Sequence, residues 1–368
     1  MVEYAKYELK NVCSRLSSGK SISSKMISEE GRYPVYGGNG LRGYTDHSNF
    51  SGDCAIIGRQ GAFCGNVRYF CGEAYMTEHA VIVCANNLNN THYLAYLLST
   101  MNLGRLSGQS AQPGLSVKTL GIQEIMLPSI EYQNKVVALL SSLDEKIAVN
   151  NNINDNLQQQ AFSVFDNLIA NAENNDYTVS DYAFLNPKRT LAKNQVARSI
   201  DMSQLSTSGA FPSGWEMKPF NGGMRFTNGD TLLARITPCL ENGKTAFIDF
   251  LDDGEVAFGS TEYIVLAPKN DTPPEMLYCL ARYPAFVDYA VKNMNGSSGR
   301  QRVSAETVGQ YRLPLFDKHS LVLFKEVVSP MFLKMRYNSL ENMRLAELRD
   351  ALLPKLMSGE IDVSAVQL

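Results

Sequence analysis

The sequence predicts an α+β protein with two similar globular domains and two long antiparallel helices that pair as a coiled coil. Two observations lead to this expectation. Short motifs occur twice, in the same order and about half the chain length apart. Each half also ends in a long segment with apolar residues at helical spacing, which is typical of paired helices.

The internal repeat consists of four motif pairs. The pairs are residues 52–57 with 229–234, 77–83 with 261–266, 107–116 with 295–304, and Leu127-Pro128 with Leu313-Pro314, at offsets of 177, 184, 188 and 186. Four pairs in one order at nearly one spacing favour a duplicated unit, and the chain is then a pseudo-twofold repeat.

The first part of each repeat is predicted to be a small α+β domain. Four short apolar runs are typical of strands: 55–58, 80–84, 231–234 and 263–267. Glycine and proline turns separate them, and one helical segment follows in each repeat, at 93–99 and at 275–282. Ser116 and Ser304 are expected to cap short helices.

The second part of each repeat is predicted to be a long helix. The segment from Ser129 to about Ala172 lacks glycine and proline, and its apolar residues alternate three and four positions apart. Asn150 and Asn154 fall on the same seam. Buried asparagines there reduce stability but fix register, so they indicate a paired helix. About 40 helical residues make a rod of roughly 60 Å.

The second long helix follows the same pattern and is expected to stop at Gly359. Pro330 interrupts it, so we expect a kink there or a short helix followed by a longer one that begins at Pro330. The alternative for both segments is that each helix packs on its own globular domain. The unbroken length and the polar seam favour pairing instead.

Several catalytic classes are disfavoured. Gly19-Lys20-Ser21 lacks the upstream glycine of a phosphate-binding loop, and Asn186-Pro187 is an incomplete amino-methyltransferase motif. The seven scattered cysteines and four unpaired histidines predict no disulfide framework and no metal site. A metal-dependent nuclease around Glu241 remains a weaker alternative. No apolar run spans a bilayer and the first residues lack a signal-peptide pattern, so we expect a cytoplasmic protein.

Polar, glycine-rich loops carry the residues that could bind DNA. The net charge of −3 gives no support, but the acidic excess lies entirely in 131–176, with 7 acidic and 2 basic residues. Arginine pairs with guanine, and asparagine or glutamine with adenine. The competing interpretation is that these loops are solvated surface turns. The candidate DNA contacts are Lys20, Asn39, Arg42, Arg59, Gln60, Gln109, Ser110, Arg235, Asn242, Lys244, Ser297, Ser298, Arg300 and Arg302.

This layout resembles the specificity subunit of type I restriction-modification systems. The motifs that carry the resemblance are residues 33–40 and 56–62 for one target recognition domain, 228–244, 259–262 and 296–303 for another, and 127–133, 143–147 and 352–361 for the spacer helices. His319 stands where glutamine is expected after the second Leu-Pro pair. The resemblance implies recognition domains at 1–130 and 174–316, a spacer helix at 131–173, and a second spacer helix with a C-terminal tail at 317–368.

The resemblance also implies a function. Each domain would read one half of a split site in double-stranded DNA, and the helices would set the gap. The chain itself would have no catalytic residue and no cofactor. Its partners would be two methyltransferase subunits that bind S-adenosylmethionine and flip the target adenine, with an ATP-dependent restriction subunit as a further candidate. The alternatives are a DNA-binding scaffold or regulator without a cognate methyltransferase, and an enzyme in its own right.

Overall fold

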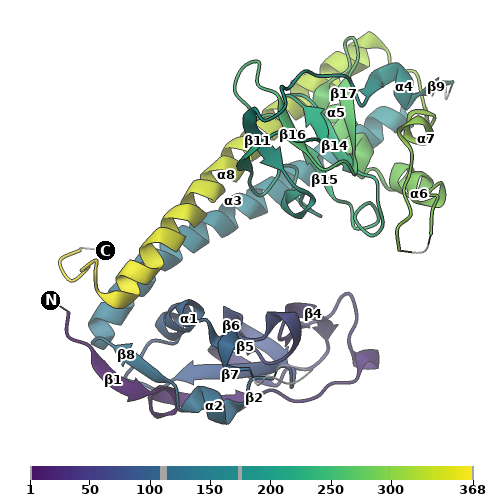
Figure 1. Cartoon of the computed structure of the whole chain (residues 1–368). Coiled ribbons are helices and arrows are strands. Elements are labelled where there is room, and N and C mark those ends of the chain that lie inside the picture. Colours follow the sequence, from purple (N-terminus) through teal and green to yellow (C-terminus); the bar gives the residue numbers. More distant parts are fainter. Residues whose placement is uncertain (1, 108–113, 173–175, 298, 367–368) are drawn as a thin grey trace. The chain divides into compact units, whose positions relative to one another are not determined.

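A computed structural model describes residues 2–107, 114–172, 176–297 and 299–366 of the chain (Figure 1). The chain divides into two compact units. Unit 1 contains Met1–Asp144 and Ala346–Leu368, and unit 2 contains Glu145–Leu345. The division therefore falls within the two long helices, so that each unit includes part of both.

Unit 1 is built on a six-stranded sheet. Its strands, in order across the sheet, are β2 (Cys13–Ser18), β7 (Ala80–Ala85), β5 (Phe50–Gly58), β6 (Val67–Met76), β3 (Tyr33–Gly37) and β4 (Gly40–Thr45). Neighbours are antiparallel except β3 and β6, which are parallel. A separate ladder pairs β1 (Ala5–Glu8) with β8 (Glu124–Leu127).

Helices cover one face of this sheet. Ala55, Ile57, Val81 and Val83 point from β5 and β7 into a core with α1 (Thr91–Thr100) and the first turns of α3 (Ile130–Ala170). Helix α2 (Val117–Gly121) joins the same core, and the Ser116 side chain caps it as expected. The alternate residues of the strands, including Cys54 and Ile56, form a second core on the other face.

Unit 2 contains two four-stranded sheets. The first consists of β10 (Ala183–Leu185), β17 (Tyr263–Pro268), β14 (Thr231–Ala234) and β15 (Thr245–Phe247), in that order. The second consists of β12 (Glu216–Pro219), β11 (Val196–Ile200), β16 (Ala257–Gly259) and β13 (Met224–Phe226). A further ladder pairs β9 (Tyr177–Thr178) with β18 (Arg312–Leu313).

The two faces of the first sheet of unit 2 pack into different cores. Leu233 and Ile264 pack with α5 (Pro274–Arg282), α3 and α8 (Lys318–Ser358), whereas Leu232 and Val265 pack with residues of the second sheet. The remaining helices of this unit are α4 (Val179–Tyr182), α6 (Pro284–Lys292) and α7 (Ala305–Gly309). The Ser304 side chain caps α7, as expected.

The two units share a strand order. In unit 1 β2, β7, β5 and β6 are neighbours, and in unit 2 β10, β17, β14 and β15 are neighbours in the same sequence of roles. Each unit also pairs its first strand with the strand that leads into a long helix, β1 with β8 and β9 with β18. All four expected strands and both expected helical segments are present in these positions.

The register of the repeat differs by one residue from the motif pairing in the sequence. Ile57 in unit 1 and Leu233 in unit 2 both face the core that contains residues of α3, so Gly58 corresponds to Ala234. The offset of 177 would instead align Gly58 with Arg235. Because successive side chains of a strand point to opposite faces, an error of one residue would exchange the two cores. The Gly-Asp pair that guided the sequence alignment is therefore out of structural register.

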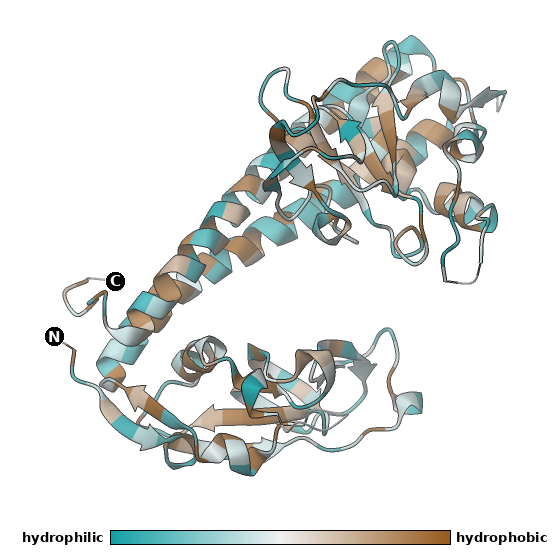
Figure 2. Ribbon diagram, viewed as in Figure 1, coloured by the Kyte–Doolittle hydropathy of each residue, from teal (hydrophilic) through white to brown (hydrophobic). Residues whose placement is uncertain are grey.

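The two long helices run antiparallel to each other within each unit. In unit 1 Arg349 pairs with Asp144 at 2.7 Å. In unit 2 the fully buried Asn150 donates to Glu341 and Asn342, and Asn338 donates to Asn154. Figure 2 shows hydrophilic and hydrophobic residues alternating along both helices. The polar seam thus joins one helix to the other, as its spacing predicts.

Pro330 does not divide the second helix. Helix α8 is continuous from Lys318 to Ser358, so the expectation of a separate helix that begins at Pro330 is wrong. Pro330 is exposed, and water can therefore bind the backbone carbonyl that its missing N–H leaves free. The expected stop is confirmed, because Gly359 adopts φ 76°, which favours glycine.

Gln133 fastens the start of α3 to the loop before α1. Its fully buried side chain accepts from the Asn90 N–H and donates to Asn89 and to the Pro128 carbonyl. The residue before α5 in unit 2 is Pro273, which has no N–H that needs an acceptor. This explains why exposed His319 can replace the glutamine in unit 2.

We expect Gln133→Ala to lower the free energy of unfolding by about 2 kcal/mol, because it leaves the Asn90 N–H and the Pro128 carbonyl without their partner. His319→Ala is the matched control and should change stability by less than about 0.5 kcal/mol. Urea denaturation of both variants tests this. Equal losses would show that Gln133 does not have the bracing role that its contacts indicate.

All seven cysteines are free, but only Cys54 and Cys279 are buried. None of the helices in the described residues is long and apolar enough to cross a membrane.

Candidate nucleic-acid interface

The described candidate residues of unit 1 gather around the turn between β6 and β7. The Lys20 N–H donates to the Met76 carbonyl, and the Thr77 N–H donates to Tyr36 at the end of β3. The Arg59 N–H donates to the His79 carbonyl. Loops that are distant in sequence therefore lie together at one end of the strands of this sheet.

Arg59 and Gln60 follow β5 directly. The Gln60 side chain contacts the His79 ring at 3.1 Å, and the Arg59 guanidinium lies 3.5 Å from the Glu78 carbonyl. Arg59 is half-buried and Gln60 is exposed. The loop before α2 returns to the same place, because the Leu115 N–H donates to the Arg59 carbonyl.

The β3–β4 hairpin supplies two more candidates. Asn39 is exposed in its two-residue turn, and Arg42 is exposed on β4 beside Gly37. The Arg68 guanidinium lies so close to Gly40 that an added Cβ would approach it to 2.9 Å. Gly40 also adopts φ 102°, so a side chain is disfavoured there on both grounds. Arg68 is exposed and adds a cation that the sequence analysis did not select.

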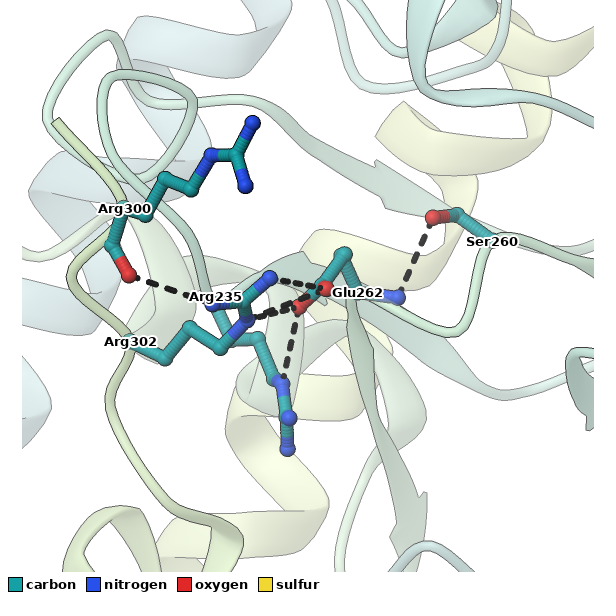
Figure 3. Close-up of polar contacts among 5 residues, drawn as sticks. All are labelled: Arg235, Ser260, Glu262, Arg300 and Arg302. Atoms are coloured by element: carbon teal, nitrogen blue, oxygen red, sulfur yellow. Dashed lines mark hydrogen bonds and ion pairs between the residues drawn. The ribbon is translucent and has the colours of Figure 1, made fainter. Parts of the chain in front are cut away.

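Unit 2 brings two candidate arginines to one carboxylate and holds a third, Arg300, nearby through its backbone. We call Arg235, Glu262, Arg300 and Arg302 the Glu262 cluster (Figure 3). Arg235 follows β14, and Glu262 lies in the turn before β17, where its N–H donates to the Ser260 hydroxyl. The Arg235 Nε lies 3.2 Å from Glu262 Oε2.

Arg302 is the arginine that Glu262 binds most completely. Its Nε lies 3.0 Å and 2.9 Å from the two carboxylate oxygens, and its Nη2 lies 2.7 Å from Oε1. Its Nη1 donates to the Arg300 carbonyl at 3.1 Å. The hydrogen bonds from Arg302, and then from Arg235, lower the pKa of Glu262 below its ordinary value, so the carboxylate is ionised at neutral pH.

The other candidates of unit 2 lie in nearby loops. Asn242 and Ser297 are exposed. Lys244 is half-buried, and its ammonium donates to the Met202 carbonyl at 2.7 Å, so it already has an internal partner. Gln109, Ser110 and Ser298 lie outside the described residues.

Arg59 in unit 1 and Arg235 in unit 2 make equivalent backbone hydrogen bonds, which we call the same backbone frame. The Arg235 N–H donates to the Glu262 carbonyl, as the Arg59 N–H donates to His79. The Arg235 carbonyl accepts from Val303, as the Arg59 carbonyl accepts from Leu115. Single β-bridges follow in both units, Gln60 with Gly114 and Ile236 with Arg302. His79 and Gly114 therefore occupy the places of Glu262 and Arg302.

A buried ion pair lies at the start of β14, the strand that leads to Arg235. Asp230 precedes β14, is 1% exposed, pairs with Arg189 at 2.6 Å and accepts from the Thr227 N–H. Burial raises the pKa of Asp230 to about 6, although Thr227 and Arg189 oppose the shift. The group therefore titrates in the folded protein well above its ordinary range.

This pKa predicts a pH-dependent stability. Because the folded pKa lies above the unfolded value, the contribution of Asp230 is complete below about pH 4 and is lost as the pH rises through about 6. We expect the free energy of unfolding of the wild type, relative to Asp230→Asn, to fall by about 2 kcal/mol between pH 4 and pH 7. Urea denaturation at both pH values measures it. Parallel changes in the two proteins would contradict the assignment.

Three residues of these sites were not predicted from the sequence. His79 and Glu262 lie within motifs that indicated the repeat, but nothing in a linear motif shows that Glu262 meets an arginine 40 positions later. Arg68 gave no signal, because only the fold of β6 beside the β3–β4 hairpin brings it to Gly40.

The comparisons with known proteins agree with the resemblance. The family model described as type I restriction modification DNA specificity domain matches residues 1–159. The chain is 40% identical to the EcoprrI type I restriction enzyme specificity subunit of Escherichia coli over 134 residues, which is 35% of this chain and 33% of that protein. This match thus spans about a third of that relative's length. The HindI specificity subunit of Haemophilus influenzae is 22% identical over 328 residues, 68% of this chain and 71% of that one.

A solved structure shares the fold. The type I restriction-modification S subunit from M. genitalium aligns with a TM-score of 0.61 and 18% sequence identity, over 96% of both chains. Together with the strand and helix arrangement above, these matches confirm the resemblance inferred from the sequence. Residues 1–159 thus match the type I restriction modification DNA specificity domain, and the chain is similar to type I restriction-modification specificity subunits.

Proposed function

We propose that this chain is the DNA-specificity subunit of a type I restriction-modification complex and is not itself catalytic. Each unit reads one half of a split site in double-stranded DNA. The relatives named above are specificity subunits, which supports this assignment. The candidate loop residues of both units are the proposed DNA contacts, and those of unit 1 include Arg68 in addition.

One observation carries the proposal. Two units with the same strand order hold Arg59 and Arg235 in the same backbone frame, but surround them with different side chains, His79 and Gly114 in one and Glu262 and Arg302 in the other. A shared backbone frame with different side chains would allow the two units to read two different base sequences with the same loop geometry. Arginine is also the residue that most often contacts guanine in the major groove.

The paired helices have a second proposed role. We propose that α3 and α8 set the number of unread base pairs between the half-sites and dock two methyltransferase subunits, which bind S-adenosylmethionine and flip the target adenine. The matched hydrogen bonds at Asn150 and Asn154 fix one register between the helices, which a ruler requires. Neutralisation of phosphate by these partners would explain why the chain need not be basic.

Selection from a pool of random DNA duplexes tests the proposal. The full chain, with its methyltransferase subunits where the complex forms, is incubated with the pool, and bound duplexes are sequenced. The proposal predicts two short conserved half-sites separated by a gap of constant length. Enrichment of one uninterrupted motif, or of no motif, would contradict it.

A further inference from the structure

We infer that Glu262 and Arg302 are positioning residues, and that the terminal nitrogens of Arg235 and Arg300 are the groups of the Glu262 cluster that read bases. The inference rests on the proposed function, because it assigns roles within the DNA-reading surface of unit 2. It differs from the expectation that all three arginines contact DNA alike.

The hydrogen bonds of Arg302 show why it suits a positioning role. All three of its side-chain nitrogens bind within the protein: Nε and Nη2 bind the Glu262 carboxylate, and Nη1 binds the Arg300 carbonyl. A base edge could recruit this guanidinium only by breaking a bidentate pair of ionised groups, which is among the stronger side-chain interactions. Arg302 also fixes the backbone of the residue that precedes it by two positions.

Arg235 has the opposite arrangement. Glu262 binds only its Nε, and within the part of the chain that the structure describes its two terminal nitrogens have no partner. Figure 3 shows these nitrogens pointing away from the carboxylate. The side chain is 32% exposed, so its terminal fork is accessible while its stem is held. This is the geometry of a guanidinium oriented in advance for a bidentate contact.

Arg300 also keeps a free guanidinium. Its side chain is exposed and forms no hydrogen bond or ion pair within the described residues, and Figure 3 shows it directed away from Glu262. Its backbone, however, is held. Arg302 exchanges two hydrogen bonds with Asn295, and the Gln301 carbonyl accepts from Thr237. The ends of the 295–302 loop are therefore fixed at the base of the cluster.

The charge of Glu262 has a second consequence. A carboxylate that is 24% exposed among arginines repels phosphate, so it weakens contacts that any DNA sequence could make. It therefore acts against non-specific binding while it orients Arg235 for specific binding. Removal of the charge should change these two affinities in opposite directions, which loss of structure alone would not do.

Unit 1 supplies an internal control. It gives Arg59 the same backbone hydrogen bonds, but His79 and Gly114 stand in place of Glu262 and Arg302. Among the residues that the structure describes, no carboxylate pairs with the side chain of Arg59. The inference thus predicts that variants of Glu262 affect the half-site read by unit 2 and leave the other half-site unchanged. A folding defect of the whole chain would affect both.

The test repeats the duplex selection with Glu262→Gln and then measures binding to the selected duplex and to a scrambled one. We expect about a tenfold loss for the selected site and about a threefold gain for scrambled DNA. Glu262→Asp, which keeps the charge, should retain the low affinity for scrambled DNA. Glu306→Gln removes an exposed carboxylate of α7 in the same unit and should change the ratio of the two affinities by less than twofold.

The outcomes separate the inference from the proposed function. If the wild type selects a split site and Glu262→Gln retains the full ratio of specific to non-specific affinity, the function stands and the inference is wrong. Equal weakening at both half-sites would also overturn it, because it would indicate a structural defect. If the wild type selects no sequence, both fail. Arg302→Ala gives an independent check, since it should reduce sequence selectivity at the unit 2 half-site as Glu262→Gln does.

Discussion

Arg235→Ala should reduce recognition of one half-site by about 10- to 100-fold and leave the other half-site unchanged. A bidentate contact between arginine and guanine contributes about 1–3 kcal/mol of discrimination, or about 5- to 160-fold, and the expected loss lies within these limits. The Arg235 fork is held at Nε and open at its terminal nitrogens, so alanine removes the reading group without removing a buried partner. Arg300→Ala should weaken the same half-site, because its guanidinium rises from the loop that Arg302 holds.

Arg59→Ala is the matched variant for the other half-site. Its backbone frame equals that of Arg235, so it should weaken only the half-site that unit 1 reads. Equilibrium competition with duplexes that carry one scrambled half-site measures each effect separately. If either variant weakened both halves equally, the arginine would be a phosphate contact or would be assigned to the wrong half.

Insertion of one matched heptad into each long helix should lengthen the gap between the half-sites without altering either sequence. The insertions belong between Asp144 and Asn150 in α3 and between Asn342 and Arg349 in α8, where neither inter-helix contact is broken. Seven residues at about 1.5 Å each add roughly 10 Å, and B-DNA rises about 3.4 Å per base pair. The gap should therefore grow by about 3 base pairs.

The control is the same insertion in α3 alone. It moves Asn150 one heptad away from Glu341 and Asn342 and leaves a buried amide without partners, at a cost of about 1–3 kcal/mol for that residue in addition to the lost seam packing. We expect this variant to lose sequence-specific binding. Duplex selection reports the gap directly, and an unchanged gap in the double insertion would contradict the role of the helices as a ruler.

The sequence predicts the elements of this protein better than it predicts their side-chain geometry. The apolar runs and the heptad spacing are local signals, so the central strands and both long helices could be located from them. The Asn150 and Asn154 positions followed from spacing alone. Pro330 gave the expectation of a separate helix, which the continuous α8 contradicts, because the effect of a proline depends on its exposure and the sequence does not state it.

The candidate site depended on contacts that are distant in sequence. The arginine-rich loops supplied the candidate residues of each unit, but the proposed role of Arg302 depends on Glu262. The pairing of β14 with β17 and the bridge between Ile236 and Arg302 bring these two residues together. Similarly, the motif offset of 177 aligned Gly58 with Arg235. Only the strand register showed that Arg59 is the equivalent of Arg235.

The most direct test of the account is a map of DNA modification. The chain is produced together with the methyltransferase subunits of a type I system from the same genome, in a host without adenine methylation, and modified adenines are located across the genome. The account predicts modification within a split motif of two half-sites and one fixed gap, and loss of one half-site from the motif with Arg235→Ala. A stable complex that modifies no adenine, or modifies without a split motif, would contradict it.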